Sequence, residues 1–577
     1  MKKTSFTAAI VGSAAMLAAA AVARDARAFC GFYVSGAEAS LTNNATQVVL
    51  MRDGARTVLS MQNGYQGPPQ DFAMVVPVPV VLKKENVKTL ARDVFDHVDK
   101  LTAPRLVEYW EQDPCPRPLP QNRLYKAMEM APMAAVGAGR GGGALPAVRI
   151  EAQFSVGEYD VVVLSATDST ALDSWLQQNK YKIPAGAEPY LRPYVQMGMK
   201  FFVAKVDVSK VKFERIGNGP EQAILSPLRF FYDSDAFNLP IRLGLINSGG
   251  TQDLVVTILG RNQRYEVANY DNVAIPTNIN VSDAARNEFG AFYAKLFDQT
   301  IEKHPRSVVT EYSWQSSSCD PCPTPPLEGS DLATLGADVL PGVAPAPPVG
   351  RGAPIIAPAP VIPWNLVNSF VVTRLHARYS KDSLGDDLFF RPAPPIVGGR
   401  EFMQQNGKLE EGARPDSSNN FQARYIIRHP WTGPIACKDP RRGVWGGPPG
   451  GSEPPTLAAS KIGFVARRGV LTLNAFVRGA LPPESLLSRG AATPVIAIPA
   501  ALTDVVDAGP AMPEAGLSIE AAGGAPTVDA GVPMPPPTPP PRGGCAGCTA
   551  VGGGASSAGA IVALLGIAVA RLRRKRR

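Results

Sequence analysis

The residues of this chain best suited to chemistry are two cysteines three positions apart, Cys319 and Cys322. Thiols at this spacing can exchange with a disulfide, most readily where the N-terminus of a helix lowers the pKa of the first thiol. Pro323, Pro325 and Pro326 follow at once, so no regular helix can begin at the motif. The pattern therefore favours a structural disulfide over the chemistry of a thiol–disulfide oxidoreductase.

Five cysteines between the two ends of the chain are candidates for disulfide bonds. Their number is odd, so one is free or pairs unusually, and the sequence leaves the connectivity open. A zinc site would need about four ligands, but only Cys319 and Cys322 stand close together, so we expect no metal. The five candidates are Cys30, Cys115, Cys319, Cys322 and Cys437.

Two acidic stretches offer oxygen ligands that a calcium ion could use. Neither has the spacing of a calcium-binding loop, and acidic residues are common in turns, so the sequence favours ordinary turns. The ligands on offer are Asp233, Asp235 and Asn238 in the first stretch and Asp382, Asp386 and Asp387 in the second.

The remaining patterns carry no catalytic or cofactor signal. Gly137–Gly142 matches G-x-G-x-x-G by count, but that motif binds a dinucleotide only between a strand and a helix, and neither is predicted there. We therefore expect a loop and no cofactor. Neither G-x-S-x-G nor H-E-x-x-H occurs, and none of the four histidines lies in a recognisable motif; they are His97, His304, His376 and His429.

The elements that must position these residues are mostly strands. Gln47–Arg52 and Arg56–Gln62 flank an Asp-Gly pair, which predicts a hairpin because glycine accepts the positive φ of a tight turn. Asp71–Leu82 is apolar enough for a buried strand, and Pro77 and Pro79 indicate an edge or a kink. Further predicted strands are Val148–Val156, Tyr159–Ala166, Met199–Val208, Leu225–Tyr232, Ile241–Asn247, Leu254–Gly260, Val308–Trp314, Phe370–Tyr379, Arg424–Arg428, Gly463–Arg467 and Val470–Phe476.

A few short helices accompany the strands. Apolar residues recur at helical spacing over Asp93–Gln112, which predicts two short helices broken at Pro104. Asp168 or Ser169 can cap a helix that ends near residue 179. The longest predicted helix, Ser282–Lys303, has a stripe of five residues that we assign to the core: Phe289, Phe292, Tyr293, Leu296 and Phe297. The fold class that follows is a strand-rich α+β body with loops rich in proline and glycine.

The N-terminus has the features of a secretory signal peptide. Lys2 and Lys3 precede an apolar stretch, Phe6–Val22, and Ala26-Arg27-Ala28 forms a cleavage site. We therefore expect residues 1–28 to be removed on export.

The C-terminus has three successive parts after a proline tract at 533–541. The first is a small-residue motif with Cys545 and Cys548, the second is the uncharged stretch Thr549–Ala570, and the third is the basic cluster Arg571–Arg577. The uncharged stretch is long enough for a single apolar helix across a membrane, with the basic cluster on the cytoplasmic side. This order resembles the tripartite MYXO-CTERM sorting signal of bacterial surface proteins. The resemblance implies cleavage near one of the two cysteines, without defining which, and anchoring at the outer surface.

The charge of the chain comes from its two ends. The whole sequence has 58 Lys and Arg against 50 Asp and Glu, but residues 29–570 have 48 against 49. A protein that binds nucleic acid needs a basic surface to neutralise phosphates. The mature body has no basic surplus, so we exclude nucleic acid as a partner.

Composition divides the chain into six segments. Low-complexity stretches rich in Pro, Ala and Gly cannot form a core and are expected as linkers or stalks. The expected segments are a signal peptide at 1–28, a strand-rich α+β region at 29–335, a linker or insertion at 336–363, a second strand-rich region at 364–500 that could pack on the first, a disordered stalk at 501–544 and the sorting signal at 545–577.

Short motifs along the body occur in an order shared with one known family. They are Cys30-Gly31-Phe32, Tyr65-Gln66-Gly67-Pro68, Asp71-Phe72-Ala73, Val75–Pro79, Ala103-Pro104-Arg105, Trp314, Cys319-Asp320-Pro321-Cys322 and Asp386-Asp387-Leu388-Phe389-Phe390-Arg391. With these motifs the body resembles the bacterial secreted proteins grouped as domain of unknown function 2330, from about residue 29 to 480. The resemblance implies a class of exported protein and no catalytic residues.

These observations predict an exported protein, anchored at the cell surface, with a binding or structural role rather than an enzymatic one. Its expected partners are the membrane, through the C-terminal segment, and the export and sorting machinery, while the surface ligand is unknown. The alternative is a secreted enzyme, either a hydrolase or a thiol–disulfide oxidoreductase that uses Cys319 and Cys322.

Overall fold

A computed structural model describes the folded body of the chain. The described residues are 32–33, 45–62, 73–115, 148–179, 181, 186–215, 221–245, 252–343, 362–380, 383–401, 408–450, 456–458, 472–482 and 484–491. Several predictions lie outside these residues: the signal peptide, Cys30, the Gly137–Gly142 loop, Asp382, the Gly463–Arg467 strand, and the stalk, Cys545, Cys548 and apolar helix of the C-terminus. Within the described residues the fold is strand-rich α+β, which confirms the predicted class.

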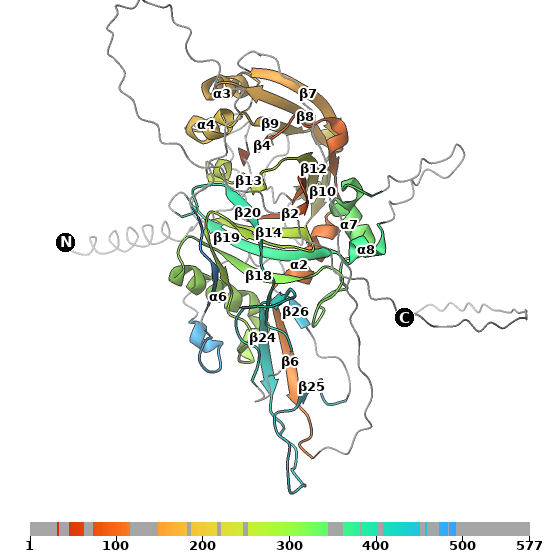
Figure 1. The fold of residues 1–577 in the computed structure, drawn as a ribbon, viewed down its shortest axis with the longest axis vertical. Coiled ribbons are helices and arrows are strands. Elements are labelled where there is room, and N and C mark those ends of the chain that lie inside the picture. The colour runs from red at the N-terminus through yellow and green to blue at the C-terminus, as the bar shows by residue number, and fades with distance from the viewer. Residues whose placement is uncertain are drawn as a thin grey trace, which may run out of the picture. The chain divides into compact units, whose positions relative to one another are not determined.

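The largest sheet has twelve strands (Figure 1). Its main path runs β22 (Arg414–Pro415), β21 (Ile396–Gly398), β23 (Asn420–Gln422), β18 (Ser307–Gln315), β19 (Phe370–Tyr379), β14 (Gln252–Arg261), β2 (Ala45–Asp53), β3 (Arg56–Gln62), β12 (Leu228–Asp233) and β5 (Val87–Thr89). Two more strands extend it beside β18, namely β16 (Asp271–Ala274) and β27 (Ser485–Ser488). The predicted hairpin is confirmed: β2 and β3 pair antiparallel around Gly54, which has a φ of 58°.

One strand of this sheet arrives late in the sequence. β19 lies between β14 and β18 and pairs antiparallel with both, although it follows both along the chain. The predicted regions 29–335 and 364–500 therefore contribute strands to the same sheet.

A second sheet has five antiparallel strands, in the order β1 (Phe32–Tyr33), β4 (Ala73–Val78), β9 (Lys200–Val206), β8 (Tyr159–Ala166) and β7 (Val148–Val156). Helices α3 (Ser169–Gln178) and α4 (Glu188–Gln196) pack on one of its faces. Asp168 caps α3, as predicted, by accepting a hydrogen bond of 2.7 Å from the amide of Ala171.

A third sheet is built on a parallel pair, β6 (Arg105–Glu111) and β24 (Arg424–His429). The register places Arg424 opposite Arg105 and Arg428 opposite Tyr109. The remaining strands of this sheet are β17 (Ile279–Asn280), β25 (Trp445–Gly446) and β26 (Thr456–Ala458).

Smaller elements complete the described fold. The other helices are α2 (Asp93–Thr102), α5 (Ala284–Asn287), α6 (Phe289–Lys303), α7 (Gly329–Leu335) and α8 (Trp364–Val367). Two small sheets comprise β10 (Lys212–Arg215) with β11 (Glu221–Ile224), and β13 (Asn238–Leu239) with β20 (Leu388–Ala393) and β15 (Arg264–Val267). The 3₁₀ turns are η2 (Lys84–Asn86), η3 (Val208–Lys210), η4 (Arg242–Leu245), η5 (Ala337–Val339) and η7 (Leu473–Ala475).

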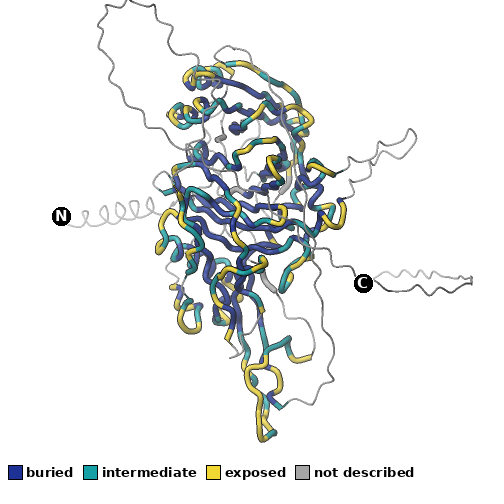
Figure 2. Tube along the Cα trace, in the orientation of Figure 1, coloured by how far each residue is buried: buried dark blue, intermediate teal, exposed yellow. Residues whose placement is uncertain are grey.

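The core is arranged in layers on both faces of the largest sheet. One face packs against the second sheet, and the opposite face packs against α2, α7, α8 and α6. Figure 2 shows the buried residues concentrated along the central strands. The aromatic stripe of α6 is buried, as predicted, and contributes to the core beside β18 and β24. Because β14, β18 and β19 are covered on both faces, nearly every residue in them is buried, including charged ones such as Glu311 and Arg374.

The prediction of a second helix after Pro104 is wrong. Pro104 ends the helical segment at α2, and residues 105–111 form strand β6. The spacing of apolar residues over Leu106–Trp110 also fits a strand, and pairing with β24 decides between the two. A single-sequence pattern cannot detect this partner because β24 lies more than 300 residues later.

Two predicted strands are also wrong within the described residues. The Ile241–Asn247 segment contains η4, because the amides of Ile241 and Arg242 bond to the Asp387 carboxylate rather than to a neighbouring strand. The described part of Val470–Phe476 contains η7, which places Phe476 against Phe292 of α6.

The predicted linker begins too early. Residues 336–343 belong to the folded body, because Ala337 and Leu340 are buried against α2 and α7 and Asp338 forms an ion pair of 2.8 Å with Arg229. Residues 344–361 of the predicted linker lie outside the described part, whereas its last two residues are described. None of the described helices has both the length and the apolarity needed to span a membrane.

Candidate functional site

A chain of buried charges lies between the largest sheet and its helices. Arg374 on β19 donates to Glu311 on β18 at 2.6 Å and to Asp99 on α2 at 2.7 Å. The other oxygen of Glu311 is 2.7 Å from Nδ1 of His376 on β19 and accepts a bond of the same length from the hydroxyl of Tyr293 on α6. These five side chains link the sheet to α2 and α6 through polar contacts.

The chain of charges continues along β19. Nε2 of His376 is 3.4 Å from Asp253 on β14, and Arg378 donates to the same carboxylate at 2.8 Å. Arg378 also pairs with Asp298 on α6. Cations and anions therefore alternate along the chain from α2 to α6.

The charges fix one another's ionisation. Burial alone would raise the pKa of Glu311, but the cations His376 and Arg374 lower it to about 2. Burial alone would lower the pKa of His376, but the carboxylates of Glu311 and Asp253 raise it to about 9. The pair is therefore charged at neutral pH.

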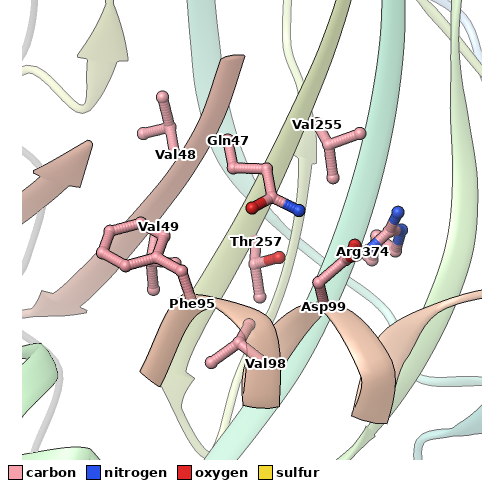
Figure 3. A pocket seen from close by; sticks show the side chains of 9 residues that line it. All are labelled: Gln47, Val48, Val49, Phe95, Val98, Asp99, Val255, Thr257 and Arg374. Carbon is pink, nitrogen blue, oxygen red and sulfur yellow. Dashed lines mark hydrogen bonds and ion pairs between the residues drawn. The ribbon is translucent and has the colours of Figure 1, made fainter. Parts of the chain in front are cut away.

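The centre of this chain of charges, from Asp99 to His376, is buried. The space beside Asp99 and Arg374 is a cavity of about 10 Å³, which is the size of one water molecule (Figure 3). Gln47 and Thr257 close it from the sheet, as Figure 3 shows. We conclude that these charges join the sheet to its helices and do not form an active site.

An open pocket of about 350 Å³ lies on the third sheet. Arg424 and Arg428 lie on one face of β24, because side chains two or four positions apart in a strand share a face, and Tyr109 lies beside them on β6. The pocket is lined by Tyr109, Glu401, Leu409, Arg424, Arg428, Gly443, Val444 and Trp445.

Arg424 is buried and held by neutral acceptors. It donates to the side-chain oxygen of Asn278 at 2.8 Å, to the hydroxyl of Tyr109 at 3.0 Å and to the carbonyl of Arg400. Glu401, itself bonded to Tyr109, is 3.8 Å away. Burial lowers the pKa of Arg424.

Arg428 lies against an aromatic ring. Its guanidinium carbon is 5.0 Å from the centre of the Trp445 ring, a cation–π contact. Burial lowers the pKa of Arg428, and repulsion by Arg424 lowers it further. Among the described residues, no carboxylate forms an ion pair with Arg428.

The wall that carries Trp445 is held by Glu111, the last residue of β6. Its carboxylate accepts hydrogen bonds from the amide of Gly443 at 2.8 Å, the amide of Trp431 at 3.0 Å and the guanidinium of Arg442 at 2.9 Å. These bonds lower the pKa of Glu111. Gly443 has a φ of 79°, a conformation that favours glycine.

The four described cysteines form two disulfides. Cys115 is joined to Cys437, with a Cα–Cα distance of 5.6 Å, and this bond ties the segment before the pocket wall to the end of β6. Cys319 is joined to Cys322. The loop between them is fixed to the third sheet, because the carbonyl of Pro321 accepts a bond of 2.6 Å from Arg105.

The four histidines do not come together. His376 belongs to the buried charges, and His304 follows the last residue of α6. His429 stacks on Trp110 and contacts Glu108 at 2.8 Å. His97 contacts the carbonyl of Pro325 at 2.8 Å. Among the described residues, no ring nitrogen of a histidine is bonded to a serine hydroxyl or a cysteine thiol, as activation of a nucleophile would require.

The acidic stretches bond to the protein itself. Asp233 pairs with Arg56, and Asp386 pairs with Arg242. Asp387 accepts a bond of 2.7 Å from the hydroxyl of Tyr194, besides those from the η4 amides. Asp235 is bonded through its carbonyl, and Asn238 lies in β13. In the described part of the chain, no three metal-binding side chains are grouped as a metal site requires.

The pocket was not predicted, although the sequence holds a signal for it. Arginines at 424 and 428 enclose three apolar residues, Tyr425–Ile427, in a short strand, and a charge inside such a strand must have a buried partner or a functional role. The same signal occurs at Glu311, Arg374 and His376, where it marks buried ion pairs. Pattern alone does not distinguish the two cases.

Comparison with known proteins identifies a family. A family model described as "Uncharacterized protein conserved in bacteria" matches residues 24–391. No curated protein and no solved structure matches the chain. The matched range includes Tyr109 of the pocket and ends before its other lining residues. Since the match covers more than half of the 577 residues, the chain belongs to the bacterial family of uncharacterised proteins named domain of unknown function 2330.

Proposed function

We propose that this protein is exported, is anchored at the cell surface and binds a ligand in the pocket on its third sheet. The observation that carries the binding role is the open pocket of about 350 Å³, in which two arginines meet an aromatic wall. Its volume lies within the range of small-molecule sites, about 300–1,000 Å³. Export and anchoring are supported by residues 1–28 and 545–577 of the sequence.

Binding fits the lining of the pocket better than catalysis does. Covalent catalysis needs a nucleophile activated by a nearby base, and the described lining residues include no serine, cysteine, lysine or histidine. Among those described residues Glu401 is the single carboxylate, so they do not provide the pair of carboxylates of a glycosidase. The lining groups are suited to holding a ligand.

Anchoring is tested by non-reducing peptide mapping, by mass, of protein taken from the membrane and surface fractions of its native host. We expect the mature chain to begin at Phe29 and to end near Cys545 or Cys548, with one of these cysteines modified. Recovery of an intact Arg577 in the surface fraction would exclude the sorting signal. Recovery of Met1 would exclude the signal peptide.

The binding role is tested by a fragment screen using ligand-observed NMR on the mature protein. We expect a set of hits that Trp445→Ala removes and that Trp364→Ala leaves unchanged. Trp364 is a matched control, because it is 74% exposed on α8 and does not line the pocket. If no hit depends on Trp445, the pocket is not a binding site.

A further inference from the structure

We propose that the pocket binds a small organic anion, with a carboxylate at Arg428 and an apolar body against Trp445, an inference that rests on the binding role proposed above. Three features of the pocket support this ligand class: the charge of its lining, its apolar surface and the rigidity of both.

The lining has an excess of positive charge. Arg424 and Arg428 line the pocket, whereas Glu401 is the single carboxylate among its described lining residues. Glu401 is already engaged, since it accepts the hydroxyl hydrogen of Tyr109 and lies 3.8 Å from Arg424. Its negative charge therefore offsets that of Arg424, and the charge of Arg428 is left over.

Arg428 has the chemistry of an anion site. A guanidinium presents donors in a planar fork that matches the two oxygens of a carboxylate. The cation–π contact with Trp445 holds the guanidinium at the ring, and the half-buried position strengthens its attraction for an anion. Within the described residues Arg428 forms no ion pair of its own, so a ligand carboxylate would supply the missing counter-charge.

Apolar side chains also line the pocket. Leu409 packs with Val107 and Ile426 in a small cluster, and Val444 and the Trp445 ring contribute further apolar surface. Val444 is 52% exposed, which leaves apolar surface for a ligand to cover. A volume of about 350 Å³ is near the lower end for ligand sites, so the body is about the size of one aromatic ring with a short chain.

Both sides of the pocket are fixed in advance. Arg424 is held by three acceptors, and the wall carrying Trp445 is held by Glu111 and by the Cys115–Cys437 disulfide. A site that is ordered before its ligand arrives loses little entropy on binding. This rigidity distinguishes the pocket from a gap between surface loops.

The test uses three probes of equal size and different charge: 3-phenylpropanoate, its neutral amide 3-phenylpropanamide, and the cation 3-phenylpropylamine. Binding to the mature protein is measured by saturation-transfer NMR and titration calorimetry. We expect the acid to bind most tightly, the amide more weakly and the amine not at all. Because a charge-assisted hydrogen bond is lost, Arg428→Gln should weaken the acid about tenfold or more and leave the amide unchanged.

The matched control is Arg192→Gln, which removes an exposed arginine on α4 and should leave all three affinities unchanged. Thermal unfolding of both variants shows whether Arg428→Gln is folded, and Arg428→Lys, which keeps the charge, should recover part of the binding. If Trp445-dependent hits exist but the acid does not bind, or binds Arg428→Gln equally well, the anion proposal is wrong while the pocket stands. Preferential binding of the amine would also contradict the anion proposal, because it would show that the negative charge of Glu401 dominates the pocket. If no hit depends on Trp445, the binding role itself is wrong.

Discussion

Charged side chains inside apolar strands have two different roles in this molecule. In β18 and β19, Glu311, Arg374 and His376 satisfy one another and leave a cavity of only about 10 Å³. In β24, Arg428 forms a cation–π contact with Trp445 beside an open pocket. Removing one partner of a buried ion pair leaves an uncompensated charge and costs about 3–5 kcal/mol. A single change in the first group should therefore cost about that much stability, whereas Arg428 can lose its charge with little effect on stability.

The buried histidine predicts a pH dependence of stability. The pKa of His376 is about 9 in the folded protein against a usual value of 6.5, so its stabilising effect is complete below pH 6.5 and is lost as the pH rises through 9. Glu311, whose pKa is lowered to about 2, remains charged over this range. We expect the free energy of unfolding of the wild type, relative to His376→Gln, to fall by about 3 kcal/mol between pH 6 and pH 10.

The measurement is urea denaturation of both proteins at a series of pH values. His304→Gln is the matched control, since His304 follows α6 outside the chain of charges. A difference between wild type and His376→Gln that stays constant from pH 6 to pH 10 would show that His376 is not held as a cation. The other groups around His376 are Asp253 and the Phe297 ring, which stacks on it at 3.9 Å.

At the scale of elements, the sequence predicts the features that depend on neighbouring residues and misses those that depend on residues far away along the chain. The β2–β3 hairpin and the cap of α3 depend on neighbours in sequence, namely Gly54 and Asp168, and both were predicted. Strand β6 depends on β24, and η4 depends on the Asp387 carboxylate. These partners are far away along the chain, so the sequence pattern near Pro104 or Ile241 contains no trace of them.

The two disulfides differ in the length of chain that each closes. Cys115 and Cys437 are separated by 322 residues, and Cys319 and Cys322 by 3. In the chain-entropy account, a longer loop restricts the unfolded state more. Replacing Cys115 and Cys437 by serine should therefore destabilise the protein by roughly 5 kcal/mol. Replacing Cys319 and Cys322 should cost roughly 2 kcal/mol.

Guanidinium denaturation of the two double variants measures this difference. Equal losses, or a larger loss for Cys319 and Cys322, would contradict the expected order. The same proteins test the oxidoreductase alternative, because insulin reduction by the wild type that disappears in the Cys319 and Cys322 double variant would establish a redox activity.

At the scale of the whole molecule, the boundary expected from composition does not divide the fold. β19, from the region after residue 363, lies between β14 and β18 from the region before residue 336. The low-complexity composition of 336–363 predicts a linker or insertion, but composition does not reveal which strands such a segment joins. The candidate pocket likewise joins Tyr109 to residues after 400.

This arrangement predicts that the two regions cannot fold apart. We expect a fragment of residues 29–343 to lack a cooperative thermal transition, because β14 and β18 lose the neighbour that they share. Adding a fragment of residues 362–500 during refolding should restore the transition. Circular dichroism measures the transition in each case. A protein cut at an engineered protease site at residue 350 after folding is the control and should melt as one unit. A fragment 29–343 that melts cooperatively at the temperature of the whole chain would contradict the expectation.

The position of β19 also determines the order in which the largest sheet can assemble during synthesis, when the chain emerges N-terminus first. β14 and β18 are complete before β19 exists, so for a time they border a gap one strand wide in the middle of the sheet. β6 lacks its neighbour for longer still, because β24 follows more than 300 residues later. Open hydrogen-bonding groups at such a gap attract other extended chains. During synthesis, the most vulnerable part of this protein is therefore its centre rather than its outer edges.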